Sequence, residues 1–124
     1  MEPRPDVIVD FVFEEGLLYV AVQNIGTEPA LGVKVSFDHP FRGLGGAELM
    51  PALGLFRNIV FLAPGRAIRT LVDSSAAYYA RGEPERIQAT ITYSDRSGGE
   101  FSSTIAHDLS IYRDVAFLVN VERT

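Results

Sequence analysis

The stretch LLYVAVQNIGTEPALGVKVSFD, residues 17–38, decides the fold class of this chain. Apolar side chains occupy every second position in each half of it: Leu18, Val20 and Val22, then Val33, Val35 and Phe37. This period of two is typical of a β-strand with one buried face, because successive side chains of a strand point to opposite faces. A helix would need apolar residues three and four positions apart, and neither half supplies them. The stretch therefore predicts two strands.

A polar turn separates these two strands, Asn24-Ile-Gly-Thr-Glu-Pro29. Gly26 can adopt a positive φ, and Pro29 has no N–H to offer to a central ladder. The connection is longer than the two-residue loop of a tight hairpin. The second strand is therefore free to lie in a facing sheet instead of beside the first.

The rest of the chain adds five segments with strand character and one helical turn. The expected strands are residues 6–13, 56–62, 67–73, 86–94 and 100–109, and the expected helical turn is residues 75–81. Asp73-Ser74 is placed to cap this turn and Gly82 to end it. Short strands separated by frequent turn signals are typical of a β-sandwich. We therefore expect an all-β protein, an immunoglobulin-like β-sandwich of about seven strands with one short helical turn, in a single domain over residues 1–124.

The alternation also predicts which side chains meet between the two sheets. Residues 86–94 place Ile87, Ala89, Ile91 and Tyr93 on one face. Because the inward faces of both sheets form the core of a sandwich, we expect one shared apolar core. Its expected central residues are Val20, Val22, Val35, Phe37, Ile91 and Tyr93.

Composition disfavours several classes of protein. The formal net charge is −5, whereas proteins that bind nucleic-acid phosphates normally carry a basic patch. The same charge disfavours an anionic membrane surface. No apolar run approaches the roughly 20 residues of a membrane-spanning helix, and no signal-peptide pattern is present. The chain has no cysteine, so there is no disulfide framework, and the cellular compartment stays unassigned.

Candidates for catalysis or metal binding are few. His39 and His107 are the two histidines, and each adjoins an aspartate, Asp38 or Asp108. Neighbours on a strand point to opposite faces, so each His–Asp pair is expected to be poorly placed to share a ligand. The GLGG run at residues 43–46 lacks the spacing of a phosphate-binding loop. We expect no catalytic residue, no metal site and no cofactor.

Other polar and aromatic residues have structural interpretations. Asp73, Asp95 and Glu100 lack the ligand spacing of a calcium loop and are expected to serve turns and caps. Tyr78 and Tyr79 are expected to pack the helical turn against the sandwich rather than to stack on a ligand.

A series of turn residues and inward-facing residues extends through most of the chain. They are Val20, Val22, Asn24, Gly26, Pro29-Ala30, Val33, Val35, Leu62, Pro64-Gly65, Tyr93, Asp95 and Gly98. In order and spacing they resemble bacterial immunoglobulin-like domains of the CARDB (cell-adhesion-related) type. The resemblance implies a role in interaction or spacing and supplies no catalytic residues. Residues 39–54 and the tail after Asp108 match no part of that pattern.

One long connection, residues 41–54, is rich in glycine and has no clear period. Loops of this length in a small domain are commonly functional or contain short structure of their own. Residues 44–56 either cover the open end of the sandwich as a flap or offer apolar surface to a partner. The candidate partner surface, including two residues of the tail, is Leu44, Leu49, Met50, Leu53, Leu55, Phe56, Phe117 and Val119.

The chain ends in a second apolar run, residues 115–121, for which a seven-strand sandwich has no obvious place. Its valines favour a strand, whereas Asp114 could cap a helix. A terminal strand could complete its own sheet or pair with the edge of a second copy. We favour the second arrangement, a homodimer.

Two classes of function are compatible with the sequence. One is a non-catalytic protein-interaction or assembly module of bacterial origin, with an unidentified protein partner. The other is a small sandwich that binds carbohydrate or metal, or an accessory domain of an enzyme. A ligand site needs convergent polar groups in a pocket, and the sequence offers no clustered histidines and no aromatic platform beyond Tyr78-Tyr79. We therefore expect the interaction module, without enzymatic activity.

Overall fold

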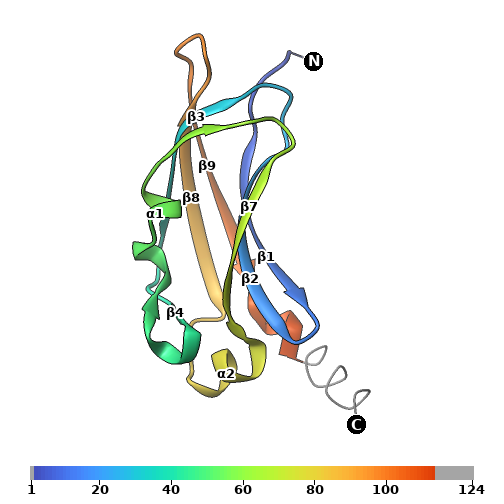
Figure 1. The fold of residues 1–124 in the computed structure, drawn as a ribbon, viewed down its shortest axis with the longest axis vertical. Coiled ribbons are helices and arrows are strands. Elements are labelled where there is room, and N and C mark those ends of the chain that lie inside the picture. Colours follow the sequence, from blue (N-terminus) through green and yellow to red (C-terminus); the bar gives the residue numbers. More distant parts are fainter. Residues whose placement is uncertain (1, 114–124) are drawn as a thin grey trace.

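Two antiparallel sheets face each other in the computed structural model, which describes residues 2–113 (Figure 1). One sheet has three strands in the order β1 (Val7–Glu14), β2 (Leu17–Asn24) and β7 (Ala67–Ser74). The other has four strands in the order β6 (Ile59–Leu62), β3 (Ala30–Phe37), β8 (Arg86–Ser94) and β9 (Glu100–Asp108). The all-β sandwich predicted from the alternating runs is confirmed.

Consecutive strands cross between the sheets where the sequence allowed it. The turn after Asn24 carries the chain from β2 in one sheet to β3 in the other. Later strands return to these two, since β7 pairs with β2 and β8 pairs with β3. The orders β1-β2-β7 and β3-β8-β9 correspond to the A-B-E and C-F-G orders of immunoglobulin-like sandwiches. The remaining strand of these two sheets, β6, pairs within the described residues only with β3 and forms an edge.

Short elements fill the connections. Between β3 and β6 lie β4 (Arg42–Gly43), the 3₁₀ turn η1 (Leu44–Gly46), β5 (Glu48–Leu49), the 3₁₀ turn η2 (Met50–Ala52) and α1 (Gly54–Arg57). The expected helical turn is α2 (Ser75–Ala80), and the 3₁₀ turn η3 (Leu109–Tyr112) follows β9. The side chain of Ser74 caps α2 by accepting a hydrogen bond from the Ala77 N–H (3.2 Å), as the sequence predicted.

The prediction of a strand over residues 56–62 is wrong at its start. Phe56 belongs to α1, and β6 begins only at Ile59. The N–H of Phe56 donates to the carbonyl of Leu53 (3.0 Å), so this backbone bonds within its own turn. The turn places the Phe56 ring in the core, where it is 1% exposed.

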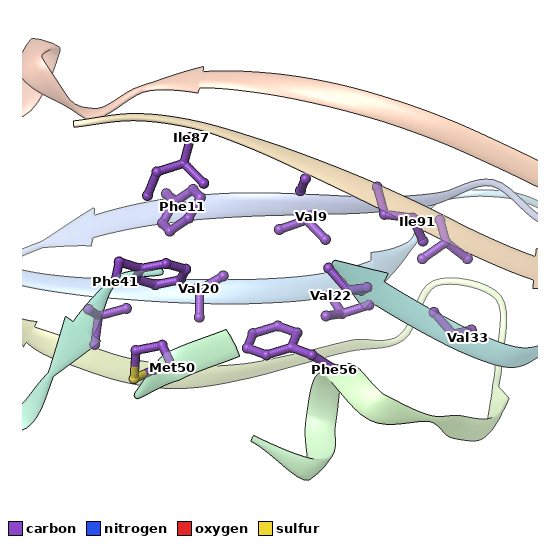
Figure 2. Packing of buried hydrophobic residues seen from close by; sticks show 14 of the residues in the cluster. Val9, Phe11, Val20, Val22, Val33, Phe41, Met50, Phe56, Ile87 and Ile91 are labelled. Atoms are coloured by element: carbon purple, nitrogen blue, oxygen red, sulfur yellow. The ribbon is translucent and has the colours of Figure 1, made fainter. Parts of the chain in front are cut away.

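The core lies between the sheets, as the alternation predicted (Figure 2). Val20, Val22 and Ile91 are 0% exposed, and Val35 and Tyr93 are 8% exposed. Phe37 is only partly buried, and its ring packs edge-on against the rings of Phe41 (5.1 Å between centroids) and Phe56 (5.0 Å).

The connection between β3 and β6 closes one side of the sandwich. Its side chains Phe41, Met50 and Phe56 point into the same core as Val20 and Val22 (Figure 2). At Gly43 the backbone approaches β7 so closely that an added Cβ would lie 2.1 Å from the carbonyl oxygen of Val72. The alternative in which this connection acts as a flap on its own sandwich is therefore the observed one.

The opposite side is closed by side chains of β9 and η3. The Nε2 of His107 lies 2.8 Å from the carbonyl oxygen of Val9, which can only accept, so this nitrogen donates. The Tyr112 hydroxyl donates to the carbonyl of Phe11 (3.2 Å). Both carbonyls belong to the edge strand β1, so its outer backbone groups are partly satisfied by side chains.

Candidate interaction surface

The structure separates the residues that the sequence grouped as a partner surface. Met50 and Phe56 are each 1% exposed, so the prediction that they contact a partner is wrong. Leu53 and Leu55 are partly buried against the same core, and Leu49 is half-buried. Leu44 is the exposed member, at 53%. The physical reason is that a small sandwich gains more by burying these side chains in its own open side.

The tail residues proposed for the same surface, Phe117 and Val119, lie outside the described residues, as does the rest of the run 115–121. The homodimer expected from that run therefore stays a prediction. The large apolar side chains of residues 44–56 pack mostly against their own sandwich.

Exposed apolar side chains gather on β6 instead. Val60 is 74% exposed and Phe61 is 55% exposed, and both lie on an edge strand. Leu31 of β3, which pairs with Phe61, is only half-buried. Among residues 2–113, β6 has a strand neighbour on one side only, so the backbone N–H and C=O groups on its other side have no ladder partner within that part of the chain.

A break in the alternation explains why two consecutive β6 residues face outward. Ile59 and Leu62 both pack against the core although they are three positions apart. The irregularity coincides with Gly32 of β3, which has a φ of 58°, and with a shift in the β3–β8 pairing. Only a residue without a side chain adopts this φ readily. Val60 and Phe61, which lie between the two inward residues, are both left outside.

Unpaired positive charges flank this apolar strand. Residues 49–72 contain three arginines and no acidic residue, in a chain whose net charge is −5. Arg69 is engaged on the other sheet, where it binds Glu14 (3.1 Å) and lies over the ring of Tyr19 (4.2 Å). Arg57 and Arg66 are exposed, and within residues 2–113 their guanidinium groups form no ion pair.

We call this region the β6 edge surface. It consists of Leu31, Val60 and Phe61 with Arg57 before the strand and Arg66 after it. It offers an apolar centre, two cationic ends and open backbone hydrogen-bonding groups. The sequence marked residues 56–62 as a short strand without showing that it lies at an edge. The run of residues 49–72 without an acidic side chain was the available signal for the positive charge of this surface.

The two histidines line one hollow of about 410 Å³ on the four-stranded sheet, together with Asp38, Asp108 and Arg86. The expectation that each histidine and its aspartate point apart is wrong for Asp38 and His39, whose Oδ1 and Nδ1 lie 2.9 Å apart. Both residues follow the end of β3, where the alternation of a strand no longer holds. Among residues 2–113, no three His, Cys, Asp or Glu side chains are grouped to hold a metal ion.

The acidic groups of this hollow are already engaged by the protein. Asp38 accepts a hydrogen bond from the Gln88 N–H (2.8 Å), which is the main reason that its pKa lies below the ordinary value. Asp108 accepts from the hydroxyl (2.6 Å) and the N–H (3.0 Å) of Ser110, and these bonds lower its pKa. Asp38 therefore joins the end of β3 to β8, and Asp108 closes a local turn.

The remaining polar candidates also serve the fold. Asp95 accepts from the N–H of Ser97 (3.0 Å) and of Gly99 (2.8 Å) and closes the β8–β9 hairpin. Burial raises the pKa of Tyr78 and, chiefly by the same cause, raises the pKa of Tyr79 to about 12. Their hydroxyls donate to backbone carbonyls, and that of Tyr78 reaches Pro84 at 2.6 Å. The packing role expected for both tyrosines is confirmed.

Comparison with known proteins adds one match. A family model described as "Domain of unknown function (DUF8453)" matches residues 1–113, which include both sheets of the sandwich. Neither the curated proteins nor the solved structures contain a match to the chain. In the part of the chain that the structure describes, no helix has the length and apolar character needed to cross a membrane.

Proposed function

We propose that this chain, which belongs to the DUF8453 family of domains of unknown function, is a non-catalytic protein-interaction module. It binds a partner through the β6 edge surface. The observation that carries this proposal is the exposure of Val60 (74%) and Phe61 (55%) on a strand that, in the described part of the chain, has one unpaired edge. Open apolar edges are aggregation hazards that proteins normally cover, so an uncovered one favours a binding role.

The other three edges of the two sheets are protected by different means. On β1, the side chains of His107 and Tyr112 reach backbone carbonyls, and β7 is approached by the backbone at Gly43. The edge strand β9 has polar or charged side chains at most of its exposed positions, such as Glu100 and Asp108. The contrast with these edges supports a specific use for β6.

A ligand-binding sandwich is the second candidate, favoured by the hollow that contains His39 and His107. Its carboxylates are already hydrogen-bonded to neighbouring backbone and side-chain groups, so few polar groups there are free to converge on a ligand. We therefore place the interaction module first. The bacterial origin and the CARDB-type relationship stay predictions.

The test compares partner binding by the wild type and by a Val60→Thr, Phe61→Thr variant. Threonine keeps the β-propensity of the strand and removes apolar contact area. We expect the affinity for a partner isolated with the wild type to fall by at least about tenfold, as in the loss of an interface hot spot. The matched control is Ile111→Thr, at an exposed position (64%) elsewhere on the molecule.

The control should bind the partner as the wild type does. Because all three substituted side chains are exposed, the free energy of unfolding should change by less than about 0.5 kcal/mol per substitution, which separates binding from stability. Equal partner binding by the wild type and the β6 variant would contradict the proposed surface.

A further inference from the structure

The charges around β6 indicate the chemistry of the partner. Arg57 ends α1 just before the strand, and Arg66 follows the turn just after it. Both are exposed, and among the described residues neither has an acidic partner. Glu28, near the paired end of β3, is directed to Arg96 (3.9 Å). Two guanidinium groups are therefore free to bind carboxylates from outside the chain.

We propose that the partner contributes an extended peptide segment with apolar residues at its centre and acidic residues at both ends. The segment adds to β6 as a fifth strand of the four-stranded sheet. This inference rests on the proposed function, since it names the kind of partner that the β6 edge surface takes.

The backbone supports strand addition. In an antiparallel ladder, alternate residues of an edge strand direct their N–H and C=O groups away from the sheet. Alternate residues of the four in β6 therefore offer outward N–H and C=O groups to an added strand, although the carbonyl of Leu62 already accepts from Asn24 (3.1 Å). Val60 and Phe61 lie beside these groups and supply apolar contact area.

Charge complementarity selects an acidic segment over a second copy of the chain. Two β6 strands paired antiparallel about a twofold axis would bring Arg57 of one copy near Arg66 of the other. Like charges across a strand pair are destabilising, whereas carboxylates at both ends of a peptide meet both arginines. The net charge of −5 repels an acidic peptide only weakly, because at physiological ionic strength salt screens the acidic groups that lie more than about 8 Å from it.

The experiment uses two labelled probe peptides of about nine residues, enough for the strand and its flanks. Both have an alternating valine–threonine centre, one with glutamates at each end and the other with lysines. Binding to the full chain is measured by fluorescence anisotropy. NMR amide shifts and hydrogen exchange then show whether Ile59–Leu62 becomes protected.

We expect the glutamate peptide to bind, to protect the β6 amides and to bind less tightly as salt is raised. The double variant Arg57→Glu, Arg66→Glu should weaken it by about tenfold or more, since two favourable charge contacts become repulsive. Arg86→Glu is the control, because Arg86 is exposed at the start of β8 and outside the β6 edge surface. This variant should bind as the wild type does.

Three results would overturn the inference. Equal or tighter binding of the lysine peptide at β6 would remove the acidic specificity and leave the edge as a protein-binding site. Protection of no β6 amide by either peptide, while the Val60 and Phe61 substitutions still abolish partner binding, would remove strand addition alone. Light scattering that shows self-association lost in the Val60→Thr, Phe61→Thr variant would make a second copy the occupant.

Discussion

At the scale of single residues, Asn24 is the polar centre of one end of the sandwich. It is fully buried, and its Oδ1 accepts hydrogen bonds from the N–H groups of Asp6 (3.1 Å) and Gly26 (2.9 Å). Its Nδ2 donates to the carbonyls of Glu28 (2.8 Å) and Leu62 (3.1 Å). One side chain therefore links the segment before β1, the β2–β3 turn and the end of β6. In this way it connects the two sheets.

We expect Asn24→Ala to reduce the free energy of unfolding by about 2–4 kcal/mol, because it leaves several buried backbone groups without partners. Urea denaturation measures the change. Asn58→Ala is the matched control at an exposed asparagine, and it should cost less than about 0.5 kcal/mol. Similar losses in the two variants would show that the hydrogen bonds of Asn24 contribute little.

At the scale of elements, Arg81 fastens the long connection to the sandwich. Its guanidinium donates to Asp73 (2.6 Å) and Glu83 (3.1 Å) and to the carbonyl of Arg42 (2.8 Å). The N–H of Gly45 donates to the same oxygen of Asp73 (2.8 Å). The carboxylate at the end of β7 thus holds η1 and the residue that follows α2, and Arg81 also holds β4.

This cluster should make stability depend on acid pH. Burial raises the pKa of Asp73, but hydrogen bonds from Gly45 and Arg81 outweigh it and hold the pKa below its ordinary value. A lowered folded-state pKa means that the carboxylate contributes stability above its unfolded pKa, about 3.9, and that this contribution is lost as pH falls through the folded pKa.

We therefore expect Asp73→Asn to cost about 1–3 kcal/mol at pH 7, and its deficit relative to the wild type to shrink as pH falls from about 5 towards 2. Denaturation curves across that range measure both quantities. Asp10→Asn, at an exposed position on β1, is the control and should follow the wild type. A deficit of Asp73→Asn that does not change with pH would contradict the role of the ionised carboxylate.

At the scale of the whole molecule, the two sheets share one core, so the stability of each sheet depends on the other. Ile91 of β8 is 0% exposed and belongs to the same cluster as Val20 and Val22 of the facing sheet. Its pairing partner Val35 lies in the same cluster. The side chain therefore stabilises the contact between the sheets as well as its own strand.

Ile91→Ala should lower the free energy of unfolding by about 2–5 kcal/mol, because it leaves a cavity between the sheets. Ile111→Ala removes the same atoms from an exposed site (64%) and is expected to change stability by less than about 0.5 kcal/mol. Thermal and urea denaturation both measure the difference. A loss of less than about 0.5 kcal/mol in Ile91→Ala, as expected for an exposed site, would contradict its place in the core.

The sequence by itself determined the strands and their inward faces. Period-two alternation is a local property, so it predicted residues 86–94 as a strand and Ile91 as a core residue without knowledge of any neighbour. The turn after Asn24 was also predicted, but Gly26 serves it for a different reason than expected. Its φ is not positive, and a glycine is needed because an added Cβ would lie 2.3 Å from the carbonyl oxygen of Arg4. These features account for the all-β fold and for most of its core.

Only the tertiary structure decided which surfaces remain open. A short apolar run such as residues 59–62 reads the same in a central strand and in an edge strand, so the apolar character of Val60 and Phe61 did not show that the fold would leave both exposed. In the same way, Met50 and Phe56 appear apolar in the sequence whether they face a partner or their own core. Long-range pairing and the packing of one connection settle both questions, because burial depends on residues far apart in the chain.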